Sequence, residues 1–331
     1  MLGLILVSVV GLSGEPSLMA RARHVMDPGD WVEWQSTVPQ YAWVNSHEVV
    51  YQEWTPRTEA RRDFWVIDVR SHTKRKLDFR WLGADFEALA RPSPSPNGTL
   101  ILWEVQKLKD SEWLVTDRQG RLVGRWPRHA RNIMASSIDE ESYSAWSADG
   151  RSVLEFDSMI PNVTGIQVWR RSLTNPHHED ILPLLGETIF PPNGSNFTDL
   201  GDGQAELVRD RFNGALDDSK CTKEIVRWSY SAPKQIERNV VTIPRHGEIW
   251  LGAVSPDRHR LVWLNITPER TQVSLWSSHI DGSSVREIGM VRCKNPGGSG
   301  EAQYFGEVHW IPGRSAVSFV YHHHLYEVDV S

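Results

Sequence analysis

This 331-residue chain has few cysteines and no excess of positive charge, so it lacks the sequence features of a disulfide-stabilised or a nucleic-acid-binding protein. It contains only two cysteines, Cys221 and Cys293, which excludes a small fold held by several disulfides. A single bond between them requires their two segments to meet, which the sequence leaves open. The net charge of −6 provides no broadly positive surface. Because phosphate backbones need one, nucleic acid is not an expected partner.

Long apolar runs are also scarce. The N-terminal stretch Leu2–Leu12 is shorter than the roughly 20 residues of a membrane-spanning helix. It is similar to the core of a secretory signal, although no basic residue precedes it. We predict that residues 1–22 form a signal peptide or hydrophobic N-terminal segment, cleaved after Ser13 or at Ala20–Ala22, and that the protein is exported (periplasmic or extracellular). The alternative is a chain start inside a longer transmembrane segment.

Local catalytic motifs are absent from the sequence. There is no G-x-S-x-G, no H-E-x-x-H, no C-x-x-C and no glycine-rich phosphate loop. His47 and Glu48 lead into Val-Val-Tyr, which indicates a turn entering a strand rather than a zinc-binding helix. An enzyme is not excluded, because loops distant in sequence can assemble a site. We predict no catalytic residue, no metal and no cofactor from these observations.

What the sequence has is a short pattern that recurs about every 50 residues, in which a strand-like segment enters a tight polar turn and a second strand leaves it. The six turns lie at Val44–Glu48, Ser95–Gly98, Ser147–Gly150, Gly201–Gln204, Ser255–Arg258 and Ile311–Arg314. Each complete unit contains four strand-like runs rich in Val, Ile, Trp and Phe. The third run of each carries an aromatic residue, namely Trp65, Trp113, Trp169, Trp228, Trp276 and Tyr326. An aromatic side chain at this position suits packing between radially arranged sheets.

The repeats predict an all-β fold: a six-bladed β-propeller of four-stranded antiparallel blades, forming a single domain over residues 30–331. The last unit supplies only three strands, Phe305–Trp310, Ala316–Tyr321 and Leu325–Val330. A spare strand precedes the first turn, at Asp30–Gln35. We predict that this N-terminal strand pairs with the last blade and closes the ring, which removes an open sheet edge. A loose N-terminal extension is the alternative.

These turns and the aspartate–glycine hairpins at Asp117–Gly120 and His279–Ser283 resemble TolB-type or WD40-like (PD40) β-propeller repeats. The resemblance covers about Asp30 to Ser331 and concerns architecture. It implies a propeller of the kind also present in some peptidases and oligosaccharide lyases. None of the 16 tryptophans is followed by aspartate, so the WD40 signature itself is missing. No S-x-D-x-G box is present, which disfavours a sialidase-type propeller.

In a propeller, the links between blades and the hairpins joining second to third strands share one rim. The basic and imidazole residues predicted there as ligand-binding candidates are Arg57, Arg128, His129, Arg131, Arg211, Arg245, His246, His322 and His324. The tripeptide Pro-Arg-His occurs in two links, and arginine gives bidentate contacts to carboxylates. Repeat inheritance with solvent-facing side chains is the alternative for this tripeptide.

The run His322–His324 is the obvious metal candidate, since neutral imidazole binds zinc, copper or nickel. Consecutive residues on an extended segment point to opposite faces, so the three cannot chelate one ion together. One of them would need His129 or His246 across the opening as a partner. Exposed turn histidines are the preferred interpretation.

Two function classes follow. The first is an exported, non-enzymatic, monomeric propeller that binds a protein or carbohydrate (glycan) ligand through its loop-rich rim, without a stable membrane span. The second is a metal-assisted lyase or hydrolase that acts on an acidic oligosaccharide at the mouth of the central channel. The absence of catalytic motifs favours the first.

Overall fold

The computed structural model describes most of the chain. The described residues are 17–27, 41–53, 63–79, 81–82, 86–107, 111–128, 143–157, 166–175, 178–185, 196–210, 221–243, 248–267, 271–292, 308–322 and 324–331. Cys293 and the predicted strand Asp30–Gln35 lie outside them. Within the described ranges no helix is long and apolar enough to cross a membrane.

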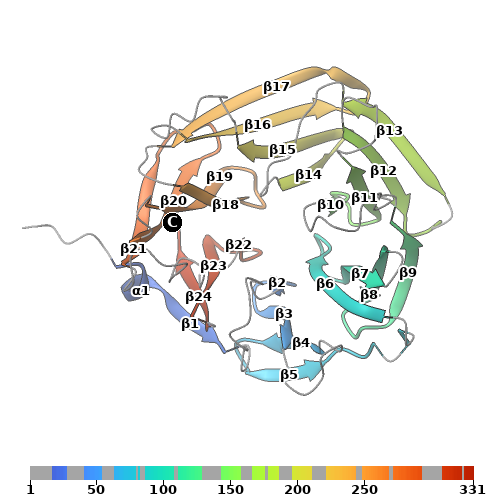
Figure 1. The fold of residues 1–331 in the computed structure, drawn as a ribbon, viewed down its shortest axis with the longest axis horizontal. Coiled ribbons are helices and arrows are strands. Elements are labelled where there is room, and N and C mark those ends of the chain that lie inside the picture. Colours follow the sequence, from blue (N-terminus) through green and yellow to red (C-terminus); the bar gives the residue numbers. More distant parts are fainter. Residues whose placement is uncertain are drawn as a thin grey trace, which may run out of the picture.

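Six four-stranded antiparallel sheets stand around a central axis, as Figure 1 shows. In five of these sheets, called blades one to five, the four strands follow the chain in order. Blade one contains β2 (Tyr41–Trp43), β3 (Glu48–Glu53), β4 (Asp63–Asp68) and β5 (Thr73–Lys76). Blade two contains β6 (Phe86–Pro94), β7 (Leu100–Lys107), β8 (Ser111–Asp117) and β9 (Leu122–Pro127). Blade three contains β10 (Tyr143–Trp146), β11 (Ser152–Asp157), β12 (Ile166–Ser172) and β13 (Glu179–Leu185). Blade four contains β14 (Asn196–Gly201), β15 (Gln204–Asp210), β16 (Cys221–Ser229) and β17 (Ala232–Ile243). Blade five contains β18 (Glu248–Val254), β19 (Arg260–Ile266), β20 (Gln272–His279) and β21 (Arg286–Arg292).

Blade six combines the two ends of the described chain. It contains β22 (His309–Trp310), β23 (Ala316–Tyr321), β24 (His324–Asp329) and the N-terminal β1 (Arg23–Met26), in the order β1-β24-β23-β22. A short helix, α1 (Leu18–Arg21), precedes β1. The prediction of an all-β, six-bladed ring closed by an N-terminal strand is therefore confirmed.

The closing strand itself differs from the predicted one. Arg23–Met26, not Asp30–Gln35, occupies the place beside β24, with Arg23 opposite Glu327 and His24 opposite Tyr326. The described propeller thus begins before residue 30. Asp30–Gln35 is richer in strand-forming residues, with two tryptophans and a valine, but pairing with β24 is a tertiary contact that local composition does not report.

The predicted turns join first to second strands in all six blades, and polar side chains explain their sequence. In blade three the Ser147 hydroxyl donates to Asp149 Oδ1 at 2.7 Å and accepts the N–H of Ser152 at 2.8 Å. The N–H of Gly150 closes the turn on the Ser147 carbonyl at 2.8 Å. Ser95 with Asn97 and Ser255 with Asp257 repeat this arrangement. The S-P-D-G-like pattern therefore reflects the side-chain and backbone hydrogen bonds that this one type of turn requires.

Two glycines in these turns provide a matched test of the packing between blades. Gly98 and Gly313 both have positive φ, +65° and +72°. A Cβ on Gly98 would lie 2.3 Å from the Val44 carbonyl oxygen of blade one, whereas one on Gly313 meets nothing within 4 Å. We expect Gly313→Ala to lower the free energy of unfolding by about 1–2 kcal/mol, the cost of left-handed backbone. For Gly98→Ala we expect about 3 kcal/mol or more, since backbone must also move.

Chemical denaturation of the two glycine variants and the parent measures this difference. Equal losses for Gly98→Ala and Gly313→Ala would show that the turns of blades one and two do not touch as described.

Tryptophans at the ends of the first strands of blades one, three and six bind each of these blades to the preceding one. The indole N–H of Trp146 donates to the Ser93 carbonyl of blade two at 2.7 Å. Trp310 bonds in the same way to Ala253 of blade five at 2.9 Å. Trp43 reaches the Ser318 hydroxyl of blade six at 2.7 Å. The rings fill the space between sheets while their single donors are satisfied across the gap.

The closure of the ring combines apolar burial with a buried carboxylate. Leu18 of α1 is fully buried between blades five and six, and Val25 of β1 is buried on the other side. Glu327 on β24 accepts hydrogen bonds from Arg23 of β1 at 2.7 and 2.9 Å, and from Arg314 at 2.8 Å. Burial alone would raise the pKa of Glu327, but these hydrogen bonds outweigh it and lower the pKa below its ordinary value.

Candidate functional site

Antiparallel blades divide the connections of the ring between two rims. One rim, called the turn rim here, carries the turns between first and second strands and the hairpins between third and fourth strands. The other, the loop rim, carries the connections between second and third strands and the links between blades. The predicted ligand-binding residues belong to the loop rim.

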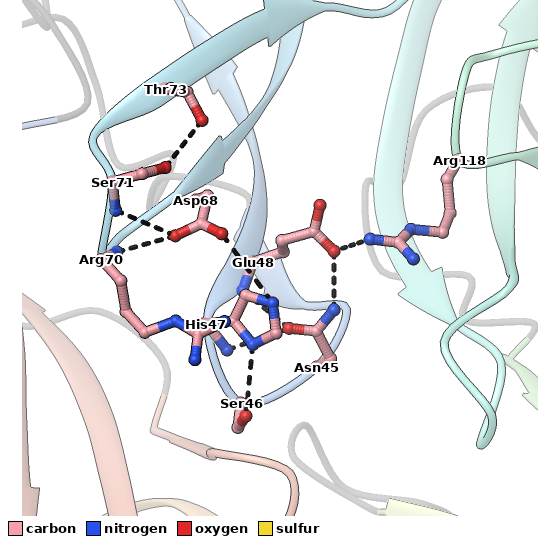
Figure 2. A network of polar contacts seen from close by, with 9 residues as sticks. All are labelled: Asn45, Ser46, His47, Glu48, Asp68, Arg70, Ser71, Thr73 and Arg118. Atoms are coloured by element: carbon pink, nitrogen blue, oxygen red, sulfur yellow. Dashed lines mark hydrogen bonds and ion pairs between the residues drawn. The ribbon is translucent and has the colours of Figure 1, made fainter.

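The turn rim of blade one holds the dense polar network drawn in Figure 2. Asn45 Oδ1 accepts the N–H groups of His47 and Glu48 at 2.9 Å, and its Nδ2 donates to Glu48 Oε2 at 2.6 Å. Arg118, from the hairpin between β8 and β9, forms an ion pair with Glu48. The network therefore shapes one turn and connects blade one to blade two.

Ser46, His47 and Asp68 in this network have the residue types of a hydrolase triad but not its geometry. The Ser46 hydroxyl lies 3.4 Å from His47 Nδ1, and His47 Nε2 lies 3.8 Å from Asp68 Oδ2. Both distances exceed those of a working nucleophile and base. Asp68 Oδ1 accepts the N–H groups of Ser71 and Arg70 at 3.1 and 2.8 Å, which lower the pKa of its carboxyl group below the ordinary value. Asp68 is a turn-capping residue.

On the loop rim, three of the predicted residues are described: Arg128, His322 and His324. The others, Arg57, His129, Arg131, Arg211, Arg245 and His246, lie outside the described residues and stay predictions. His322 is at the tip of the hairpin between β23 and β24, with a positive φ of 47° and its ring against Tyr321.

Arg128 has a structural partner. Its Nη1 donates to Glu104 Oε1 at 2.6 Å, and its guanidinium lies 5.7 Å from the centre of the Trp113 ring. The side chains of Arg128 and Glu104 are only 11% and 6% exposed. The positive charge of Arg128 is thus compensated inside blade two by Glu104. Binding of a ligand by Arg128 stays a prediction.

His324 belongs to a cluster with His24 and Asp27. Asp27 Oδ1 lies 2.7 Å from His24 Nε2 and is also bonded to His324 Nδ1. Hydrogen bonds from His324 and His24 lower the pKa of the Asp27 carboxyl group below its ordinary value. The ligand atoms of the three residues lie within 4.8 Å of one another. They are the one metal-compatible group of three found among the described residues.

A β-bulge brings this cluster to one face. His24 stands opposite Tyr326 and Met26 opposite Leu325, so the register shifts between them. In a regular strand, His24 and Asp27 would point to opposite faces; the extra residue of a bulge corrects this. The burial pattern agrees with the bulge, because Val25 and Met26 are both buried although neighbours in a regular strand point to opposite faces.

His24 and Asp27 were missed by sequence reasoning because the closing strand was assigned too late in the chain. The signal that existed is His-x-x-Asp at residues 24–27, next to a segment that must pair with the blade containing His324. The partners proposed across the channel, His129 and His246, lie outside the described residues.

Comparisons with known proteins support the architecture. No protein-family model matches the chain, and no curated protein matches it. Among solved structures, TolB from Acinetobacter baumannii is similar at a TM-score of 0.50 and 12% identity, over 85% of this chain and 63% of its own. A structure from a study of two prolyl endopeptidases matches at 0.50 and 9% identity, over 86% of this chain and 46% of its own. The propeller domain of the Trilobed protease from Pyrococcus furiosus gives 0.48 and 14%, over 89% and 84%.

At such identities the likeness concerns the fold alone. The predicted resemblance to TolB-type propellers is confirmed at that level. The chain spans less than two thirds of the TolB and endopeptidase structures, so neither protein's function transfers with the fold.

Proposed function

We propose that this protein is a non-enzymatic binding propeller, exported to the periplasm or the extracellular space, which holds a protein or glycan ligand on its loop rim. The observation that carries the proposal is the contrast between the two rims. The turns of the turn rim are short, and many of their polar groups bond to one another, as in the blade-one network of Figure 2 and in the Ser95, Ser147 and Ser255 turns. The loop rim carries the long connections of the chain, at 128–142, 186–195, 211–220 and 293–308.

Long loops on a rigid scaffold are where binding residues concentrate. The scaffold here is a closed ring, and adjacent blades share buried apolar clusters. Basic residues predicted on the loop rim, such as Arg211 in the connection 211–220 and Arg245 in the short link 244–247, provide charged contacts for an acidic glycan or protein. Export rests on the N-terminal apolar stretch Leu2–Leu12.

The alternative of a metal-assisted lyase or hydrolase has less support. It needs arginines that hold carboxylates at the channel mouth, but Arg128 is bound to Glu104. It also needs a metal-binding group of histidines at the channel, whereas the metal-compatible group found among the described residues, with His24 and His324, lies on the outer pair of strands of blade six, away from the innermost β22.

A comparison of charge reversals on the two rims tests the proposal. The parent is screened on an array of neutral and uronate oligosaccharides and against a displayed library of exported proteins, and the strongest binder is titrated. We expect Arg211→Glu with Arg245→Glu on the loop rim to weaken binding at least about tenfold, because charge-assisted contacts are lost. The matched turn-rim variant, Arg121→Glu with Arg151→Glu, should change it less than about twofold.

Two results would overturn the proposal. One is a binder whose affinity falls only in the turn-rim variant. The other is conversion of uronate oligosaccharides to shorter products by the purified parent, which would support the enzymatic alternative.

A further inference from the structure

Three metal-ligating side chains meet where the chain closes on itself. His24 and Asp27 come from β1 and the residue after it, and His324 begins β24, so the cluster joins positions 297 residues apart. We propose that His24, Asp27 and His324 bind one divalent transition-metal ion, zinc being the best match, and that this ion fastens the N-terminal strand to the last blade. The proposal is independent of the ligand-binding role of the loop rim.

The spacing of the three groups is close to that of a zinc site. Zinc binds imidazole nitrogen and carboxylate oxygen at about 2.0–2.2 Å, so ligand atoms around a tetrahedral ion are about 3.3 Å apart. The present separation of His24 Nε2 and Asp27 Oδ1 is 2.7 Å, a hydrogen-bonding distance. Binding of an ion therefore requires these two atoms to move apart by about 0.6 Å. The ion then replaces the protons that now form the hydrogen bonds between the carboxylate and the two imidazole rings.

Packing holds the two imidazoles in place before any ion arrives. The His24 and His324 rings are 5.6 Å apart, and both contact the Tyr326 ring, at 5.7 and 6.3 Å. Tyr326 faces His24 directly across the two strands, and His324 is its neighbour two residues away on the same face. The bulge in β1 turns Asp27 toward this face. Orientation of ligands in advance reduces the entropic cost of binding.

The donor set selects the class of metal. Two imidazole nitrogens and one carboxylate oxygen suit zinc and its first-row neighbours, whereas calcium and magnesium prefer oxygen ligands alone. The side chains of His24, Asp27 and His324 are 49%, 61% and 45% exposed. Water can therefore complete the coordination, as at zinc sites with three protein ligands.

The position of the cluster gives the ion a mechanical role. An ion held by both β1 and β24 binds the closed ring and not an opened one, so its binding free energy adds to the stability of closure. The ring is then more stable wherever free zinc is present, with no change in its fold.

The experiment uses the untagged full-length protein after removal of metals with a chelator. Zinc is titrated by calorimetry, thermal unfolding is recorded with and without zinc, and cobalt(II) is added to observe its visible absorption. The variants are His24→Gln, Asp27→Asn and His324→Gln. His178→Gln is the matched control, because exposed His178 pairs with exposed Asp180 at 3.1 Å in blade three, and the described part of the chain supplies no third ligand to this pair.

We expect one zinc per chain and a rise in unfolding temperature of about 4 °C or more at about 100-fold excess over Kd. Each cluster variant should weaken zinc binding at least about tenfold, remove the cobalt absorption and abolish the temperature rise. The His178→Gln variant should behave like the parent.

The proposal is overturned if no saturable site of one zinc per chain is found, or if zinc binding persists unchanged in Asp27→Asn and His324→Gln. An equal temperature rise with magnesium would also contradict it. The three side chains are about half exposed, so the metal-free variants should unfold near the parent temperature. If one variant fails to fold, the near-isosteric Asp27→Asn decides the question.

Discussion

Removal of residues 1–26 is expected to leave the ring open and close to unfolded. The deletion takes away the buried residues Leu18, Val25 and Met26, which are 0%, 7% and 6% exposed. Burial of such side chains is worth about 1.5–3 kcal/mol each, so the loss reaches about 5–9 kcal/mol as an upper estimate. This is comparable to the 5–15 kcal/mol that separates folded from unfolded domains. The deletion also leaves β24 as an open edge, which promotes aggregation.

Denaturant unfolding and sedimentation measure this effect. The matched control removes residues 1–13 only and keeps α1 and β1, so it should unfold near the parent midpoint. This pair also bears on export, because cleavage after Ser13 preserves the closure whereas cleavage after Ala22 removes α1. A 1–26 deletion that remains monomeric with the parent midpoint would contradict the closure described above.

Replacement of Trp103 by alanine is expected to have the second large effect, at the contact between blades one and two. Trp103 is fully buried and lies edge-on to Phe64 at 4.7 Å and to Phe79 at 5.2 Å. Its indole N–H donates to the buried Thr116 hydroxyl at 2.9 Å. Large-to-small changes at such positions cost about 3–5 kcal/mol, and loss of the donor adds about 1 kcal/mol or more.

Trp103→Phe separates the two contributions. It keeps an aromatic ring against Phe64 and Phe79 but removes the donor to Thr116, so we expect a smaller loss of about 1–2 kcal/mol in denaturant unfolding. A loss below about 1 kcal/mol for Trp103→Ala would mean that the interface between these blades adjusts freely, against the close packing described.

The parts of the fold that could be predicted from sequence are those set by local chemistry. The turn at Ser147–Gly150 is specified by its own serine, aspartate and glycine, which bond to one another. Repetition of that turn located the strands on either side, and the aromatic of each third strand then followed, as at Trp169 and Trp276. Each of these signals is contained within a few residues.

The closing strand and the metal-compatible cluster depend instead on partners far along the chain. Nothing in Arg23–Met26 alone distinguishes it from a linker, and its bulge exists only in register with β24. His24 gains significance only beside His324. Likewise, the position of Arg128 in the sequence predicted a residue on the rim, but its side chain is largely buried because it pairs with Glu104 on β7 of the same blade. Such properties come from tertiary contacts that local patterning does not encode.

Arg258 illustrates how the ring uses a turn position for contact between blades. It has a φ of 63° at the position where Gly98 and Gly150 have similar values. A non-glycine residue there is strained. Its guanidinium forms an ion pair with the fully buried Glu206 of blade four, which also accepts from Arg227 at 2.7 Å. The backbone strain at Arg258 is therefore offset because its guanidinium pairs with the buried carboxylate of Glu206.

Native-state hydrogen exchange tests the closure of the ring most directly, because it reports the pairing of β1 with β24 in the intact protein. Peptides covering residues 18–26 and 324–329 should exchange slowly and to a similar extent, since the two strands are hydrogen-bonded partners. Exchange of residues 23–26 at the rate of an unstructured peptide, with protection at Asp30–Gln35 in its place, would show that another segment closes the ring.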